Sequence, residues 1–280
     1  MIDPFDYKEP RCATCGGKEF YFPDKNAPTG RIPVSRVIEK ADEAYNKNDM
    51  EEAGRLLSYW QSEANALGDE AGELSVTDEL IGHYRKTGNA EKGLAAVARA
   101  LELLRKLDLE NTVSGATILL NAATTLKAFG KAKEGLPIYK RAEKVYRAHL
   151  AENDALFAGL YNNQALALAD VGEYEKAEAC YKKAIEIITA QGTRGNLDAA
   201  VSYVNLAVLY AERDGKTDKE KITDCMFKAY GLLTDENNEK NGYYAFVLSK
   251  CAPAFGNFGY TKIENELKKE SEEIYARNRA

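Results

Sequence analysis

The sequence lacks the features from which most active sites are built. It has only two histidines among 280 residues, and no Gly-rich phosphate loop, nucleophile elbow or H-E-x-x-H motif. His83 and His149 both lie in segments with a helical pattern, where a packing or surface role is expected. We therefore predict no catalytic residue, no cofactor and no enzymatic activity.

Long apolar segments and an excess of positive charge are also missing. No apolar run approaches the roughly 18 residues that a membrane span needs. The first ten residues, MIDPFDYKEP, lack the apolar core of a secretory signal. The formal net charge of −6 argues against a nucleic-acid-binding surface. We therefore expect a cytoplasmic protein that binds neither a membrane nor a nucleic acid.

The five cysteines do not form a disulfide framework, because their number is odd and they are scattered along the chain. This pattern fits a reducing compartment. Cys180, Cys225 and Cys251 lie in helical patterns and are expected to be core residues. Cys12 and Cys15 form a single C-x2-C pair, which resembles half of a zinc ribbon. A structural zinc needs four ligands, so we predict no metal site; a zinc shared between two chains and redox chemistry are the alternatives.

A 42-residue repeat dominates the remaining sequence. The period relates three sets of residues: Gly88, Gly130 and Gly172; Asn121, Asn163 and Asn205; and Ala100, Ala142 and Ala184. A fixed period of this length is typical of repeat architectures. Apolar residues at helical spacing lie on both sides of each glycine, so we predict two helices with a left-handed glycine turn between them.

The residues of each repeat resemble the tetratricopeptide repeat family. Its consensus of a small residue, a large residue, Gly, Ala, an aromatic residue and Ala is met by Ala165, Leu168, Gly172, Ala177, Tyr181 and Ala184. The match is strong in three repeats, fair in a fourth and weak at both ends. The period exceeds the family's usual 34 residues. In this respect the repeats are similar to those of kinesin light chain and of some bacterial peptide-responsive regulators.

The resemblance implies an all-α fold, a right-handed α-solenoid of about six stacked antiparallel helix pairs. We expect residues 1–32 to form an irregular arm and residues 33–280 to form the solenoid. The pairs are expected at approximately 34–67, 70–108, 112–150, 154–191, 197–235 and 242–277. Each of three asparagines should cap the helix that follows it: Asn111, Asn153 and Asn196. Pro137 should delay or kink its helix, and Pro253 should interrupt the last repeat.

The resemblance also implies a concave groove, built from the first helix of each repeat, that binds a peptide. In the family, an Asn at the position of 121, 163 and 205 often holds the backbone of an extended ligand, as a primary amide can. The structural alternative is a hydrogen bond to a neighbouring helix. The predicted peptide-binding residues are Asn121, Thr124, Lys127, Asn162, Asn163, Leu166, Asp170, Asn205, Val208 and Glu212.

The sequence thus predicts a non-enzymatic scaffold that holds a protein or peptide ligand in the groove. One alternative is a peptide-responsive regulatory switch, in which the ligand changes the pitch of the solenoid. A zinc-binding adaptor organised by Cys12 and Cys15 is another. Lys127 is nearly alone among predicted groove residues as a cation and is opposed by Asp170 and Glu212, so we do not expect a ligand held by its terminal carboxylate.

Overall fold

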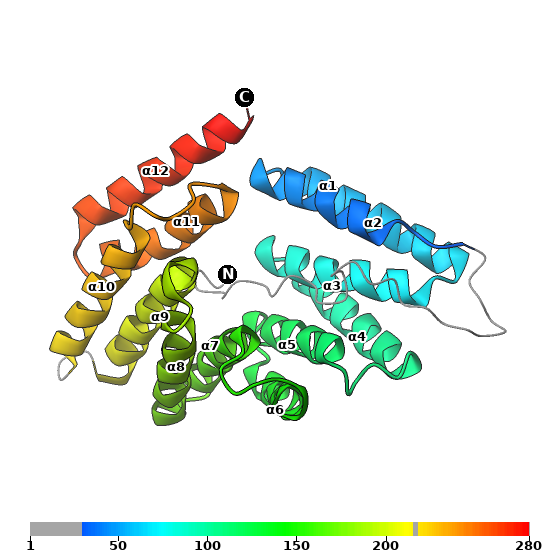
Figure 1. The fold of residues 1–280 in the computed structure, drawn as a ribbon, viewed down its shortest axis with the longest axis horizontal. Helices are drawn as coiled ribbons and strands as arrows, with labels where there is room; N and C mark the ends of the chain where they lie inside the picture. The colour runs from blue at the N-terminus through cyan, green and yellow to red at the C-terminus, as the bar shows by residue number, and fades with distance from the viewer. Residues whose placement is uncertain (1–29, 215–217, 280) are drawn as a thin grey trace. The chain divides into compact units, whose positions relative to one another are not determined.

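The computed structural model describes residues 30–214 and 218–279, and these residues are helical almost throughout, with no strand among them (Figure 1). Twelve α-helices and the short 3-10 helix Gly192–Gly195 make up the described part of the chain. The helices of the first half are α1 (Val34–Asn46), α2 (Met50–Leu67), α3 (Glu70–Lys86), α4 (Ala90–Lys106), α5 (Val113–Ala128) and α6 (Ala132–His149). Those of the second half are α7 (Ala155–Asp170), α8 (Tyr174–Thr189), α9 (Asn196–Asp214), α10 (Lys219–Leu233), α11 (Gly242–Asn257) and α12 (Thr261–Arg279).

Each odd-numbered helix packs against the even-numbered helix that follows it, which gives six pairs. The prediction of an all-α repeat solenoid of about six helix pairs is confirmed. The pairs divide into two compact units, one ending at Leu150 and the other beginning at Ala151. We call them the N-terminal unit, with α1–α6, and the C-terminal unit, with α7–α12. Within each unit, first helices of neighbouring pairs contact one another.

Glycine turns the chain between the two helices of a pair, as the period predicted. The φ angles of Gly88, Gly130 and Gly172 are 70°, 77° and 80°, in the left-handed region that other residues avoid. After Gly172 the amide of Glu173 donates to the carbonyl of Leu168 at 2.9 Å, which satisfies one of the last carbonyls of α7. The predicted glycine turns are confirmed.

The predicted helix caps are wrong by one residue. Thr112, not Asn111, caps α5, because its Oγ1 accepts the amide of Gly115 at 3.0 Å. Asp154, not Asn153, caps α7, with its Oδ1 accepting the amide of Leu156 at 2.9 Å. Asn196 does not cap α9 either, since it already has helical φ and ψ angles of −51° and −49° after the 3-10 helix.

Neither proline ends or delays its helix. α6 begins at Ala132, ahead of Pro137, and α11 continues through Pro253 to Asn257. The expected late start of α6 and interruption of α11 are therefore wrong, and a kink at Pro137 stays a prediction. In α6 the proline leaves the carbonyl of Lys133 without its helical donor, but both residues are exposed, so water can take that donor's place.

Small residues bring the paired helices close together. Ala165 of α7 and Ala177 and Ala184 of α8 are completely buried. In the pair α5–α6, a Cβ on Gly135 would lie 2.9 Å from the backbone oxygen of Ala123, closer than the packing allows. The small residues of the repeat pattern are thus required by the helix–helix contact itself.

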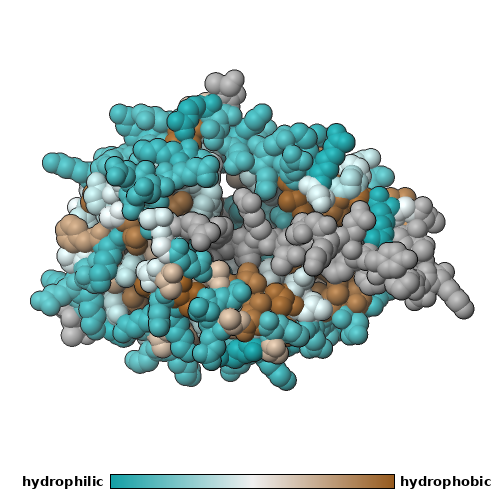
Figure 2. Space-filling view, in the orientation of Figure 1, coloured by the Kyte–Doolittle hydropathy of each residue, from teal (hydrophilic) through white to brown (hydrophobic). Residues whose placement is uncertain are grey.

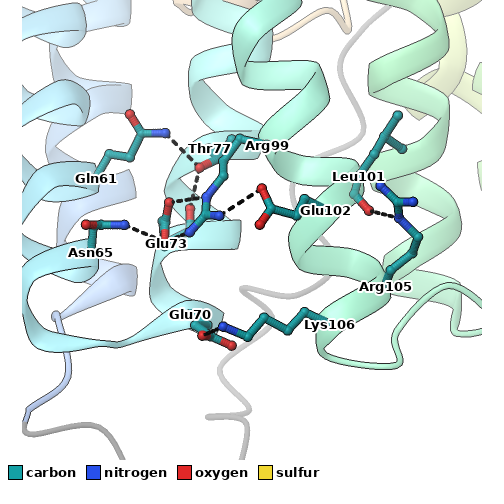
Figure 3. Close-up of polar contacts among 10 residues, drawn as sticks. All are labelled: Gln61, Asn65, Glu70, Glu73, Thr77, Arg99, Leu101, Glu102, Arg105 and Lys106. Carbon is teal, nitrogen blue, oxygen red and sulfur yellow. Dashed lines mark hydrogen bonds and ion pairs between the residues drawn. The ribbon is translucent and has the colours of Figure 1, made fainter.

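A buried carboxylate joins three helices of the N-terminal unit (Figure 3). Glu73 of α3 accepts two hydrogen bonds from Arg99 of α4, at 2.7 and 2.8 Å, and a longer one of 3.4 Å from Asn65 of α2. Glu73 is 4% exposed, so its charge needs these partners. The hydrogen bond to Glu73 raises the pKa of Arg99, with Glu102 adding to the effect. The ion pair thus joins the two helices of one pair, α3 and α4, and the hydrogen bond from Asn65 links them to α2 of the preceding pair.

Candidate functional site

The candidate site lies on the first helices of the C-terminal unit, α7, α9 and α11, with α9 in contact with both of the others (Figure 1). We call these three helices the first-helix row. A pocket of about 310 Å³ opens between α9 and α11. It is lined by Val208, Ala211, Glu212, Ala254, Asn257 and Phe258. Val208 and Glu212 are two of the residues that the sequence predicted to contact a peptide.

The lining of this pocket is mostly apolar with a polar rim. Val208 and Phe258 are half-buried, and the small side chains of Ala211 and Ala254 leave the space between the helices open. Asn257 is exposed, and Glu212, also exposed, is the single charged residue of the lining. Such a pocket can accept an apolar side chain while its rim contacts polar groups beside it.

A network of charges on the opposite side of α9 fixes the orientation of this helix. Arg213 donates to Glu178 of α8 and to Asp218, each at 2.6 Å, and the hydroxyl of Tyr210 donates to Glu178 at 3.0 Å. Burial alone would raise the pKa of Glu178, but hydrogen bonds from Lys182, Arg213 and Tyr210 outweigh it and lower that pKa to about 2. With Tyr210 and Arg213 held against α8, the other side of the helix is left to line the pocket.

Two neighbouring amides on α7 are buried with atoms that lack hydrogen-bond partners in the described part of the chain. Asn162 is fully buried, and neither its Nδ2 nor its Oδ1 has such a partner. Asn163 is 2% exposed; its Nδ2 donates to the carbonyl of Gly159 at 3.0 Å, but its Oδ1 has no partner. A buried polar atom left unpaired costs about 1–3 kcal/mol, so these amides call for an explanation.

The other predicted residues of the row differ in their exposure. Asn205 of α9 is 2% exposed, whereas Leu166 of α7 is half-buried and Asp170, the last residue of α7, is exposed. The predicted contacts that reach the surface of the C-terminal unit are therefore Leu166, Asp170, Val208 and Glu212.

In the N-terminal unit, the predicted residues of α5 are all buried. Asn121 donates from its Nδ2 to both carboxylate oxygens of Asp78 in α3, at 3.0 and 3.1 Å, which is the contact that the structural alternative predicted. Thr124 accepts the hydroxyl of Tyr139 at 3.0 Å, and Lys127 is 6% exposed. Asn121 and Thr124 therefore join helices within their unit.

The pocket also contains four residues that the sequence did not single out: Ala211, Ala254, Asn257 and Phe258. Ala254 and Asn257 belong to α11 and Phe258 directly follows it, in the repeat that Pro253 was expected to interrupt. The repeat period offers a signal for the pocket, because Ala211 stands in register with Arg85 and Lys127. A long side chain replaced by a methyl group indicates space at that position.

The structure assigns packing roles to most of the other candidate residues. His83 is 6% exposed, and its Nδ1 lies 3.2 Å from the hydroxyl of Tyr45. Burial raises the pKa of Cys225 to about 11 and that of Cys251 to about 12, so both thiols stay protonated. Cys12 and Cys15 lie outside the described residues.

Two further searches of the described residues gave negative results. No group of three or more His, Cys, Asp or Glu side chains there could hold a metal ion. None of the helices in residues 30–214 and 218–279 is both long enough and apolar enough to cross a bilayer. Figure 2 shows that hydrophilic residues predominate on the viewed face, with hydrophobic residues in smaller areas between them.

Comparison with known proteins supports the repeat assignment. Residues 156–220 match the model of the tetratricopeptide repeat family, and no curated protein matches the chain. The fold is similar to the nearly identical TPR-like repeats of a Podosopora anserina kinesin light chain, with a TM-score of 0.51 and 14% identity over 73% of this chain and 95% of that one.

Two other solved structures are similar over more of the chain. BtubC from P. vanneervenii has a TM-score of 0.48 and 20% identity over 88% of this chain and 92% of its own. The apo form of RapI has a TM-score of 0.49 and 15% identity over 88% and 98%. The family match and the likeness to the kinesin light chain repeats agree with the 42-residue period and the glycine turns. The chain therefore has the fold of tetratricopeptide repeats, and residues 156–220 match that family by sequence.

Proposed function

We propose that this protein is a non-enzymatic scaffold that binds a peptide or an extended protein segment along the first-helix row of its C-terminal unit. The observation that carries the proposal is the pocket between α9 and α11, which contains the predicted contacts Val208 and Glu212. Tetratricopeptide repeats form a fold suited to protein interaction, since stacked helix pairs present an extended surface. The cytoplasmic location stays a prediction, supported by the cysteine pattern, which fits a reducing compartment.

The amides of α7 add support. An extended ligand presents backbone donors and acceptors, and the amide atoms of Asn162 and the Oδ1 of Asn163 lack partners in the described residues. A small movement of α7 that admits a ligand backbone would satisfy them, at a gain of about 1–3 kcal/mol per pair. Asn163 and Asn205 thus remain proposed ligand contacts, while Asn121 would have to leave Asp78 to serve as one.

The test is selection from a displayed library of random heptapeptides against the purified full chain, followed by measurement of Kd for the enriched peptides. We expect micromolar binding that Val208→Arg abolishes, because a long cation would fill the apolar pocket. Ala179→Arg is the matched control, since Ala179 is exposed on the second helix α8 of the same unit.

Two results would count against the proposal. One is that no peptide is enriched over beads without protein. The other is that Val208→Arg and Ala179→Arg weaken binding equally while both variants keep the helical circular dichroism of the parent chain. Either would mean that the first-helix row does not hold the ligand.

A further inference from the structure

We infer that Asn162 of α7 is the amide that recognises the ligand, by pairing with one peptide unit of its main chain, and that the free protein is less stable because of it. The ligand is then extended at this point, and its residue type there matters little. This inference rests on the proposed function and adds which side chain reads the ligand and how binding is linked to stability.

The packing of α7 does not require an amide at position 162. The side chain is fully buried, and neither its Nδ2 nor its Oδ1 has a hydrogen-bond partner in the described part of the chain. The equivalent positions 42 residues before and after hold Leu120 of α5 and Val204 of α9, which are 1% and 0% exposed. The repeat thus accepts a buried apolar side chain at this position. An unpaired buried amide is less favourable there, so Asn162 has a role other than packing.

Two of the repeated asparagines are less suited to this recognition. The Nδ2 of Asn121 donates to Asp78 at 3.0 and 3.1 Å, and the Nδ2 of Asn163 donates to the carbonyl of Gly159 at 3.0 Å. A peptide unit presents an N–H and a C=O together, so pairing with both requires a donor and an acceptor on the same side chain. Asn162 has both to offer.

Asn162 also lies on the face of α7 that reaches the surface in its later turns. Leu166 and Asp170, four and eight residues further on, share this face; Leu166 is half-buried and Asp170 is exposed. A movement of α7 that admits a ligand beside Leu166 breaks no hydrogen bond of the Asn162 side chain. A helical ligand cannot serve, because its N–H and C=O groups are paired within the helix. An extended segment leaves these groups free for the amide.

The first experiment measures stability by thermal unfolding of the full chain, followed by circular dichroism. Asn162→Leu and Asn162→Val introduce the side chains found at positions 120 and 204. At least one of them should raise the melting temperature by about 3–6 °C, because an unpaired amide is removed. Asn121→Leu is the matched contrast and should lower it, because Asp78 loses a donor. If both variants at position 162 lower the melting temperature, the inference is overturned.

The second experiment measures the Kd of peptides enriched from the same library, with each backbone N–H replaced in turn by an ester oxygen. One ester should weaken binding to the parent chain about tenfold, whereas changing the side chain at that residue should have little effect. The stabilised variant at position 162 should bind the unmodified peptide about tenfold more weakly and should lose its sensitivity to that ester. Asn153→Leu, at an exposed position of the same unit, should keep both properties of the parent.

The outcomes separate this inference from the proposed function. If peptides are enriched but the variant at position 162 binds them as tightly as the parent does, the inference is overturned and the proposed function stands. The same holds if every ester has equal effects in the parent and in the variant. If no peptide is enriched over beads without protein, both fail.

Discussion

The charge network behind α9 gives a quantitative prediction for Glu178→Gln. This substitution keeps the size of the side chain but removes the charge that Arg213, Lys182 and Tyr210 surround. Because the network fixes α9 against α8, the variant should lower the free energy of unfolding at neutral pH. The effect should depend on pH in a way that only a titrating carboxylate can produce.

The magnitude follows from the pKa of Glu178, which is lowered from 4.5 to about 2. Each pKa unit is worth about 1.36 kcal/mol, which sets an upper limit of about 3.4 kcal/mol. Lys182 is 62% exposed, and screening by solvent reduces the expected loss to about 1–2 kcal/mol. Because the pKa of Glu178 is lower in the folded state than in the unfolded state, its carboxylate stabilises the fold fully at pH values above the unfolded pKa of about 4.5. This stabilisation is lost as the pH falls from about 4.5 towards 2. Roughly two fifths of it should be gone at pH 3.5.

The assay is urea unfolding of the full chain at pH 7 and at pH 3.5, followed by far-UV circular dichroism. The single tryptophan, Trp60, lies in α2, so its fluorescence reports the N-terminal unit separately. Glu175→Gln is the control, because Glu175 is exposed on the same helix. A variant as stable as the parent at pH 7 would refute the reasoning. So would a difference between variant and parent that is the same at both pH values.

Two matched pairs of substitutions test the packing and the caps. Gly135→Ala should destabilise by about 1–3 kcal/mol, because its Cβ would lie 2.9 Å from the oxygen of Ala123, whereas Gly231→Ala in α10 meets nothing within 4 Å and should stabilise by about 0.5–1 kcal/mol. Thermal unfolding followed by circular dichroism measures the stability of both variants. If both substitutions shifted the melting temperature in the same direction, the packing argument would be wrong. Thr112→Ala should cost about 0.5–2 kcal/mol through loss of the α5 cap, while Asn111→Ala should change the urea midpoint little. A larger effect at Asn111 would overturn the cap assignment.

The period predicted those parts of the fold that depend on one residue type. A turn in the left-handed conformation requires glycine, so Gly88, Gly130 and Gly172 located the turns directly. The caps were less predictable because two competent residues stand together at each helix start. Thr112 follows Asn111 and Asp154 follows Asn153, and only the backbone geometry decides which side chain reaches the amide.

The candidate site was predictable only in part, because it depends on contacts between repeats. The resemblance to the family brought Val208 and Glu212 into consideration, but the other wall of the pocket comes from α11 and the residue after it, where the repeat pattern is weak. The partner of Asn121 was hidden for a similar reason. Asp78 lies on a different first helix, and its residue type does not reveal whether it faces Asn121 or solvent.

One side of α9 contacts α8 and the other lines the pocket, which has a consequence for how the residues of such a protein can vary. Tyr210 and Arg213 hold the helix against α8, while positions 208, 211 and 212 line the pocket on its other side. Exchanging those three side chains as a set would alter what the surface recognises without rebuilding the scaffold beneath it. A single helix thus has one side that holds it in the fold and another side whose residues can set what is bound.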